Sequence, residues 1–162
     1  MDISKKYADI LNNSDISGLS EELKIQYIKY QYENNENDTL VLCNSLYEAT
    51  TIYNNLRTYI DNVLLFPMDD FLTTMALAVS PELKVKRLET LNAIQRENKK
   101  LVITNLMGYL KFVPNKSVLQ KMNITLNKND KINRKSFEEL IDKYGYTKTS
   151  IVTSTGEYSL RG

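Results

Sequence analysis

A glycine-rich loop that binds phosphate would be the clearest sign of a nucleotide site in this chain. The pattern G-x-x-x-x-G-K-[ST] needs a glycine followed by lysine, and none of the five glycines is followed by one. Residues 18–22 (GLSEE) precede an expected helix, where free backbone amides could face a phosphate. Glu21 and Glu22 would, however, place two carboxylates in the first helical turn and repel that phosphate. We therefore expect no ATP binding and no cofactor.

Catalytic and metal-binding side chains are also sparse. Histidine is absent, which removes the commonest general base and the His-dependent nucleophile pairs. The single Cys43 cannot form an internal disulfide or a cysteine-rich zinc site, and its apolar surroundings predict a buried strand residue. Asp69 and Asp70 follow an expected strand, where metal ligands often lie, although a solvated loop is the favoured interpretation. The residues predict no catalytic group and no metal site.

Two groups of side chains could contact nucleic acid. Tyr27, Tyr30 and Tyr32 could stack on bases, but their helical spacing favours packing in the core. A basic flank of a later helix could contact phosphates, although a solvated helix face is the favoured interpretation. This flank consists of Lys84, Lys86, Arg87 and Arg96.

Composition sets the limits within which these residues act. The 162 residues carry a net charge of +1, so no global field draws the chain to nucleic acid or membrane. A hydrophobic content of 42% is enough for a core. No apolar run approaches the ~18 residues of a membrane span, and the N-terminus lacks the apolar segment of a signal peptide. We expect a cytoplasmic protein with no membrane contact.

The first half of the chain alternates between helix and strand signals. A helix is expected to begin near Ser17 or Ser20. Residues 40–43 form a continuous apolar run, which predicts a strand buried on both faces. Ser45 and Glu48 then have the spacing of a capping box, in which each satisfies a free amide at the start of a helix.

The same alternation continues through residue 104. Residues 63–66 predict a second buried strand, and residues 101–104 a third. Between them, Ser80 and Pro81 are typical of a helix start. The apolar stripe expected for that helix is Leu83, Leu88, Leu91 and Ile94. Strand–helix alternation of this kind predicts parallel strands joined by right-handed crossovers, and hence the α/β fold class.

Beyond Gly108 the pattern changes to α+β, and we place a domain boundary near residues 113–123. A capping box at residues 136–139 predicts a helix that stops at Gly145. Strands at 151–152 and 157–160, joined by a turn at 154–156, predict a hairpin. Glu157 and Arg161 would then share its exposed face, and an exposed arginine suits a protein interface. Because the sequence ends within this strand, we expect a piece of a longer protein.

Several segments, in order, resemble one family. They are residues 44–49 (NSLYEA), 64–71 (LLFPMDDF), 76–83 (ALAVSPEL) followed by Arg87 and Leu88, 145–146 (GY) and 156–162 (GEYSLRG). Together they are similar to the N-terminal, UvrB-like region of the bacterial transcription-repair coupling factors. The similarity covers about residues 39–162, and its most specific parts are residues 78–88 and the last seven.

The resemblance implies two domains. Residues 1–115 would form a helicase-like α/β domain of degenerate P-loop NTPase type, a parallel sheet with flanking helices that has lost ATP binding. Residues 116–162 would begin a small α+β domain that docks UvrA. Arg161 matches an arginine of the family's UvrA contact, beside Glu157, while Lys148 stands where the family has another arginine. A lysine cannot supply the bidentate fork of arginine.

The function implied is that of a non-enzymatic module. It would recruit UvrA in transcription-coupled nucleotide excision repair. It would also contact other domains of the parent chain and restrain the translocase of that chain. RNA polymerase and DNA would be reached only through domains that are absent here. The alternative function is a nucleic-acid-binding, helicase-like half-domain that uses the basic flank of residues 84–96.

Overall fold

The structure is a computed structural model that describes residues 15–70, 80–95 and 98–161. The candidate Arg96 lies outside these residues. The chain divides into two compact units between Phe112 and Val113.

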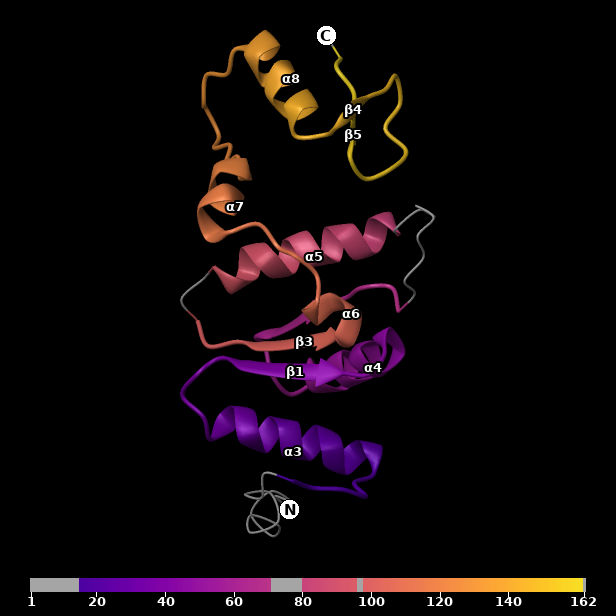
Figure 1. Cartoon of the computed structure of the whole chain (residues 1–162). Coiled ribbons are helices and arrows are strands. Elements are labelled where there is room, and N and C mark those ends of the chain that lie inside the picture. Colours follow the sequence, from indigo (N-terminus) through magenta and orange to yellow (C-terminus); the bar gives the residue numbers. More distant parts are fainter. Residues whose placement is uncertain (1–14, 71–79, 96–97, 162) are drawn as a thin grey trace. The chain divides into compact units, whose positions relative to one another are not determined.

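The first unit is built on a parallel sheet of three strands in the order β1-β3-β2, shown in Figure 1. Thr39 of β1 and Val63 of β2 both pair with Leu101 of β3, so all three strands begin at one edge of the sheet. The α/β class predicted from the alternation is confirmed. The elements are α3 (Glu21–Glu33), β1 (Thr39–Cys43), α4 (Leu46–Leu56), β2 (Val63–Phe66), α5 (Pro81–Ile94), β3 (Leu101–Asn105) and α6 (Leu106–Tyr109).

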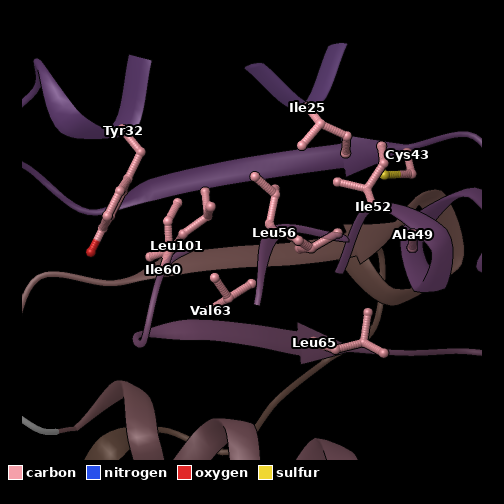
Figure 2. Packing of buried hydrophobic residues seen from close by; sticks show 11 residues of the cluster. Ile25, Tyr32, Cys43, Ala49, Ile52, Leu56, Ile60, Val63, Leu65 and Leu101 are labelled. Atoms are coloured by element: carbon pink, nitrogen blue, oxygen red, sulfur yellow. The ribbon is translucent and has the colours of Figure 1, made fainter. Parts of the chain in front are cut away.

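The hydrophobic core lies between the sheet and the helices α3 and α4. Leu101 and Ile103 of β3 are fully buried there, and Figure 2 shows Leu56 of α4 among the same cluster. Cys43 is buried, as expected, and its burial raises the pKa of the thiol to about 11. The remaining members of the cluster are Ile25, Tyr32, Ala49, Ile52, Ile60, Val63 and Leu65.

Strand β1 corrects one prediction. Its apolar run was expected to be buried on both faces, but Leu40 is 54% and Leu42 is 48% exposed. Outermost position alone is not the reason, because β2 is also outermost and is largely buried. Helices α4 and α5 both pack on β2, whereas α5 makes no comparable contact with β1. Within the described residues, its alternate side chains are covered on one face only.

Helix α5 corrects a second prediction, that of its apolar stripe. It begins at Pro81 as predicted, but Leu88 of the expected apolar stripe is 56% exposed, while Arg87 and Thr90 are buried. Thr90 Oγ1 donates to the carbonyl of Leu65 at 2.5 Å, and Arg87 Nη1 donates to that of Pro67 at 2.8 Å. The helix therefore packs through polar side chains that donate to the carbonyls of Leu65 in β2 and of Pro67 directly after it.

The second unit contains two helices and one short pair of strands. They are α7 (Lys116–Met122), α8 (Arg134–Lys143), β4 (Thr147–Lys148) and β5 (Glu157–Tyr158). The predicted hairpin is wrong, because β4 and β5 pair in parallel and residues 151–152 are not a strand. The expected capping box also shifts, since Asn133 caps α8 by accepting from the Ser136 amide at 3.1 Å. Among the described residues, no helix is long and apolar enough to cross a membrane.

Candidate functional site

The carboxyl edge of the parallel sheet is the first candidate site, because ligands of open α/β sheets bind at that edge. Strand β1 ends there at Cys43, directly before α4, and β3 ends at Asn105, directly before α6. The amides at a helix start have no partner within the helix, so they are the groups that an anion would contact. The groups that accept hydrogen bonds from these amides decide what this edge of the sheet can bind.

At the start of α4, the predicted capping box is present. Ser45 Oγ accepts from the Glu48 amide at 3.1 Å. The Glu48 carboxylate accepts from the Asn44 amide at 3.1 Å and forms an ion pair with Lys24 of α3 at 3.3 Å. The side chains of Ser45, Glu48 and Lys24 thus form hydrogen bonds or ion pairs around the start of this helix.

Asp70 completes the same helix start from a distance of 24 residues. The Leu46 amide donates to both of its carboxylate oxygens at 2.9 Å. Asn105 Nδ2 donates to Oδ1 of the same carboxylate at 2.7 Å. Asp70 lies at the surface, as a solvated loop predicts, yet its carboxylate has two protein donors. Among the described residues, no group of three His, Cys, Asp or Glu side chains is arranged to hold a metal ion.

Asn105 is the buried centre of this edge, and sequence reasoning missed it. Its side chain is 0% exposed. Oδ1 accepts from the amides of Met68 at 3.2 Å and Gly108 at 3.3 Å, and Nδ2 donates to the Met68 carbonyl at 2.7 Å as well as to Asp70. All four hydrogen-bonding positions of the amide are used. The only signal in the sequence was a polar residue at the end of an apolar run.

The start of α3 resembles that of α4. Ser20 Oγ accepts from the Leu23 amide at 3.4 Å, and Glu21 and Glu22 occupy the first turn. Hydrogen bonds from its own backbone amide and from Ser20 lower the pKa of the Glu22 carboxyl. Here too the polar groups at the helix start belong to the chain itself.

An open hollow of about 620 Å³ lies beside this edge. It is lined by the residues before α3 and by parts of α3, β1 and α4, including Tyr27 and Cys43. Its charged lining includes Lys24 and Glu48, which already form an ion pair with each other. The hollow therefore offers apolar walls and a neutralised charge pair.

The tyrosines of α3 differ in their surroundings. Tyr32 is buried, its hydroxyl donates to the Lys99 carbonyl at 3.1 Å, and the Lys99 ammonium lies 4.2 Å from the centre of its ring. Tyr27 and Tyr30 are half-buried on the same helix. Tyr32 thus packs in the core, which was the favoured interpretation.

The structure does not gather the basic flank into one exposed surface. Arg87 is buried against Pro67. Burial lowers the pKa of its guanidinium, and the nearby Asp69 charge partly opposes this. Lys86 pairs with Glu89 at 3.3 Å and lies 5.5 Å from the centre of the Tyr53 ring. Of the three members that the structure describes, Lys84 is exposed, Lys86 is half-buried and Arg87 is buried.

The second unit holds the residues expected to contact a protein partner. Arg161 is exposed but follows β5, which ends at Tyr158, so the shared strand face with Glu157 does not form. The Glu157 carboxylate instead accepts from the amides of Thr153 at 2.7 Å and Ser154 at 3.0 Å. These hydrogen bonds, that of Thr153 first, lower its pKa.

Lys148 is placed by an ion-pair network. Its Nζ lies 3.2 Å from a carboxylate oxygen of Glu138, whose other oxygen pairs with Arg134 at 3.2 Å. The Lys148 side chain remains 55% exposed. Of the three expected contact residues, Arg161 and Lys148 are open to solvent, while Glu157 organises the turn before β5.

A parallel sheet flanked by helices, with its carboxyl edge filled by the chain's own side chains, defines an α/β module consistent with a helicase-like fold. No family model matches the chain. Transcription-repair-coupling factors do: that of Staphylococcus aureus (strain bovine RF122 / ET3-1) is 30% identical over 152 residues. That of Staphylococcus haemolyticus (strain JCSC1435) is 31% identical over 149 residues.

These alignments cover 93% and 91% of this chain but 13% of each relative. The chain is therefore homologous to one region of the bacterial transcription-repair coupling factors, as the resemblance implied. It spans about an eighth of their length, and the activities of those whole proteins belong to the proposal that follows.

Proposed function

We propose that this chain is a non-catalytic interaction module of a transcription-repair coupling factor. It recruits UvrA in transcription-coupled nucleotide excision repair and, within the parent chain, restrains the translocase. The observation that carries the proposal is the similarity to coupling factors along 93% of the chain. The filled carboxyl edge of the sheet supports the non-catalytic part.

The first unit has the role of a scaffold in this proposal. At the starts of α3, α4 and α6, side chains of Ser20, Ser45 and Asn105 each accept from an amide of the first turn. A nucleotide phosphate would have to displace such groups, and carboxylates stand beside two of them. Lys24, which lines the hollow beside this edge, is paired with Glu48.

The absence of ATP turnover is the first testable consequence. Purified protein is expected to release phosphate from ATP no faster than a buffer blank, with or without DNA. Heat-inactivated protein from the same preparation controls for contaminating ATPases. Turnover that survives further purification and follows the protein peak would contradict the non-catalytic role.

The second unit provides the contact with UvrA. Arg161 is the principal contact, because its side chain is exposed and arginine is enriched among residues that dominate interfaces. Lys148 is a secondary contact, since Glu138 already pairs with it. Glu157 acts indirectly by holding residues 153–154 in their turn.

Binding to purified UvrA tests this assignment directly. Arg161→Ala is expected to weaken binding roughly tenfold or more, as for a central interface arginine, and Lys148→Ala is expected to have a smaller effect. Arg57→Ala is the matched control, because Arg57 is an exposed arginine of the first unit. Circular dichroism of each variant separates lost contact from lost folding.

Three outcomes decide between the candidate functions. Equal weakening by Arg161→Ala and Arg57→Ala would remove the proposed contact. If no variant and no wild-type protein binds UvrA, recruitment by this chain is contradicted, and DNA becomes the next ligand to test. A salt-dependent affinity for DNA, lost on reversing the charge of Lys84, would then favour the nucleic-acid-binding alternative.

A further inference from the structure

The carboxyl edge of the sheet contains a polar connection that neither catalysis nor partner binding explains. It runs from the start of α4, through the Asp70 carboxylate and the Asn105 side chain, to the ends of β2 and β3 and the first turn of α6. The hydrogen bonds of Leu46 to Asp70 and of Asn105 to Asp70 and Met68 span 24 to 37 residues of sequence, and that of Gly108 to Asn105 is local. This connection is called the edge lock below, and it consists of Leu46, Met68, Asp70, Asn105 and Gly108.

The Asp70 half of the edge lock is electrostatic. Its carboxylate receives the Leu46 amide on both oxygens at 2.9 Å, at the helix end where the backbone dipole favours negative charge. Hydrogen bonds to a charged group are stronger than neutral ones. Asp70 thereby adds a second carboxylate, beside that of Glu48, to the start of α4.

The Asn105 half is steric as well as polar. Asn105 is fully buried and has every hydrogen-bonding position occupied. A Cβ atom at Gly108 would meet the Thr104 hydroxyl, the Phe66 carbonyl oxygen and Asn105 Oδ1 at less than contact distance or at its limit. The close approach of residue 108 to Thr104, Phe66 and Asn105 therefore requires glycine at that position.

We propose that the edge lock is a conformational device that holds the carboxyl edge closed: Asp70 serves as a built-in anion at the start of α4, and buried Asn105 fixes Asp70 in that place. The carboxyl edge then holds α4, α6 and the ends of β2 and β3 in fixed positions and does not bind external phosphate. Because the edge lock belongs to the first unit, it stands or falls independently of UvrA binding by the second.

Amide hydrogen exchange measures the edge lock one bond at a time. Asp70→Ala is expected to accelerate exchange of the Leu46 amide about ten- to a hundredfold, the factor that corresponds to losing a hydrogen bond to a charged group. Asp70→Asn is expected to give a smaller acceleration, because the amide oxygen still accepts but carries no charge. Asp69→Asn is the matched control and should leave Leu46 unchanged.

Asn105→Ala tests whether Asn105 positions Asp70. It is expected to accelerate exchange of Leu46, which Asn105 does not touch, as well as exchange of Met68 and Gly108, which it does. The variant that combines it with Asp70→Ala should accelerate Leu46 no more than Asp70→Ala alone. If Asn105→Ala leaves Leu46 unchanged in folded protein, Asn105 does not hold Asp70 and the edge lock is overturned.

Inorganic pyrophosphate tests whether the edge is closed. Wild-type protein is expected to show no saturable shift of the Ser45 and Leu46 amide resonances during a pyrophosphate titration. A saturable shift in the wild type would overturn the proposal, and so would unchanged Leu46 exchange in Asp70→Ala. Saturable shifts that occur only in Asp70→Ala would support Asp70 as the built-in anion.

Discussion

The two units of this chain are stabilised in different ways. The first has a cluster of eleven buried hydrophobic residues between its sheet and two helices. In the described part of the second, Leu119 is the one hydrophobic side chain counted as buried, while apolar residues such as Ile151 and Val152 are more than half exposed. Burial holds the first unit, and polar contacts hold the second.

The polar contacts of the second unit tie its helices to its strands. The Tyr158 hydroxyl donates to the Asp142 carboxylate at 2.8 Å, and that bond, together with the carboxylate charge, raises the pKa of Tyr158 to about 12. The Tyr144 hydroxyl donates to the Lys121 carbonyl at 2.9 Å. Exposed polar contacts each contribute little to stability, so we expect the second unit to be the less stable of the two.

The largest expected effect comes from emptying the core of the first unit. Leu101→Ala removes a fully buried side chain from the central strand and should lower the free energy of unfolding by about 2–5 kcal/mol. Leu126→Ala in the second unit is the matched control, because Leu126 is 53% exposed, and should change it by about 0.5 kcal/mol or less. Urea unfolding followed by circular dichroism gives both values.

Equal losses in these two variants would contradict the comparison. They would mean that Leu126 is buried in solution, for example by self-association. Repeating the Leu126→Ala measurement over a range of protein concentrations separates that case, because only self-association makes the unfolding midpoint depend on concentration.

The sequence predicted the first unit better than the second for the same physical reason. Apolar runs at residues 40–43, 63–66 and 101–104 and the helix starts at Ser45 and Ser80 are local signals, and these elements formed. Strands β4 and β5 have two residues each, too few for a periodic pattern to identify. Their parallel pairing depends on a turn held by Glu157, which no local propensity encodes.

Within the first unit, the errors came from contacts across long sequence separations. The stripe expected for α5 was wrong because Arg87 and Thr90 reach carbonyls of the outermost strand, 20 and 25 residues away. The predicted burial of Leu40 and Leu42 was wrong because an apolar run does not reveal which helices cover each face of a strand, and α5 packs on β2 without a comparable contact with β1. Asp70 and Asn105 were missed as partners because 35 residues separate them.

The smallest expected effect concerns the pH dependence of the second unit. Hydrogen bonds from Thr153 and Ser154 favour the ionised Glu157 carboxylate, so its pKa in the folded protein lies below the ordinary value of 4.5. A folded-state pKa below the unfolded one means that the stabilising contribution is present above pH 4.5 and is lost as the pH falls through the folded-state pKa. Because Glu157 accepts from amides of a single turn, the effect should be local rather than global.

Carboxyl-carbon NMR titration checks this directly. The Glu157 resonance should titrate below the ordinary value of 4.5, and the Thr153 and Ser154 amides should shift with the same midpoint. In Glu157→Gln the pH-dependent shifts of the Thr153 and Ser154 amides should disappear. The pH dependence of the resonances of the first unit should be the same as in the wild type. A Glu157 midpoint at or above 4.5 would show that the turn is not held by the carboxylate. The second unit would then lack the polar contact that orders the chain before Arg161, and the contrast between the two units would rest on exposure alone.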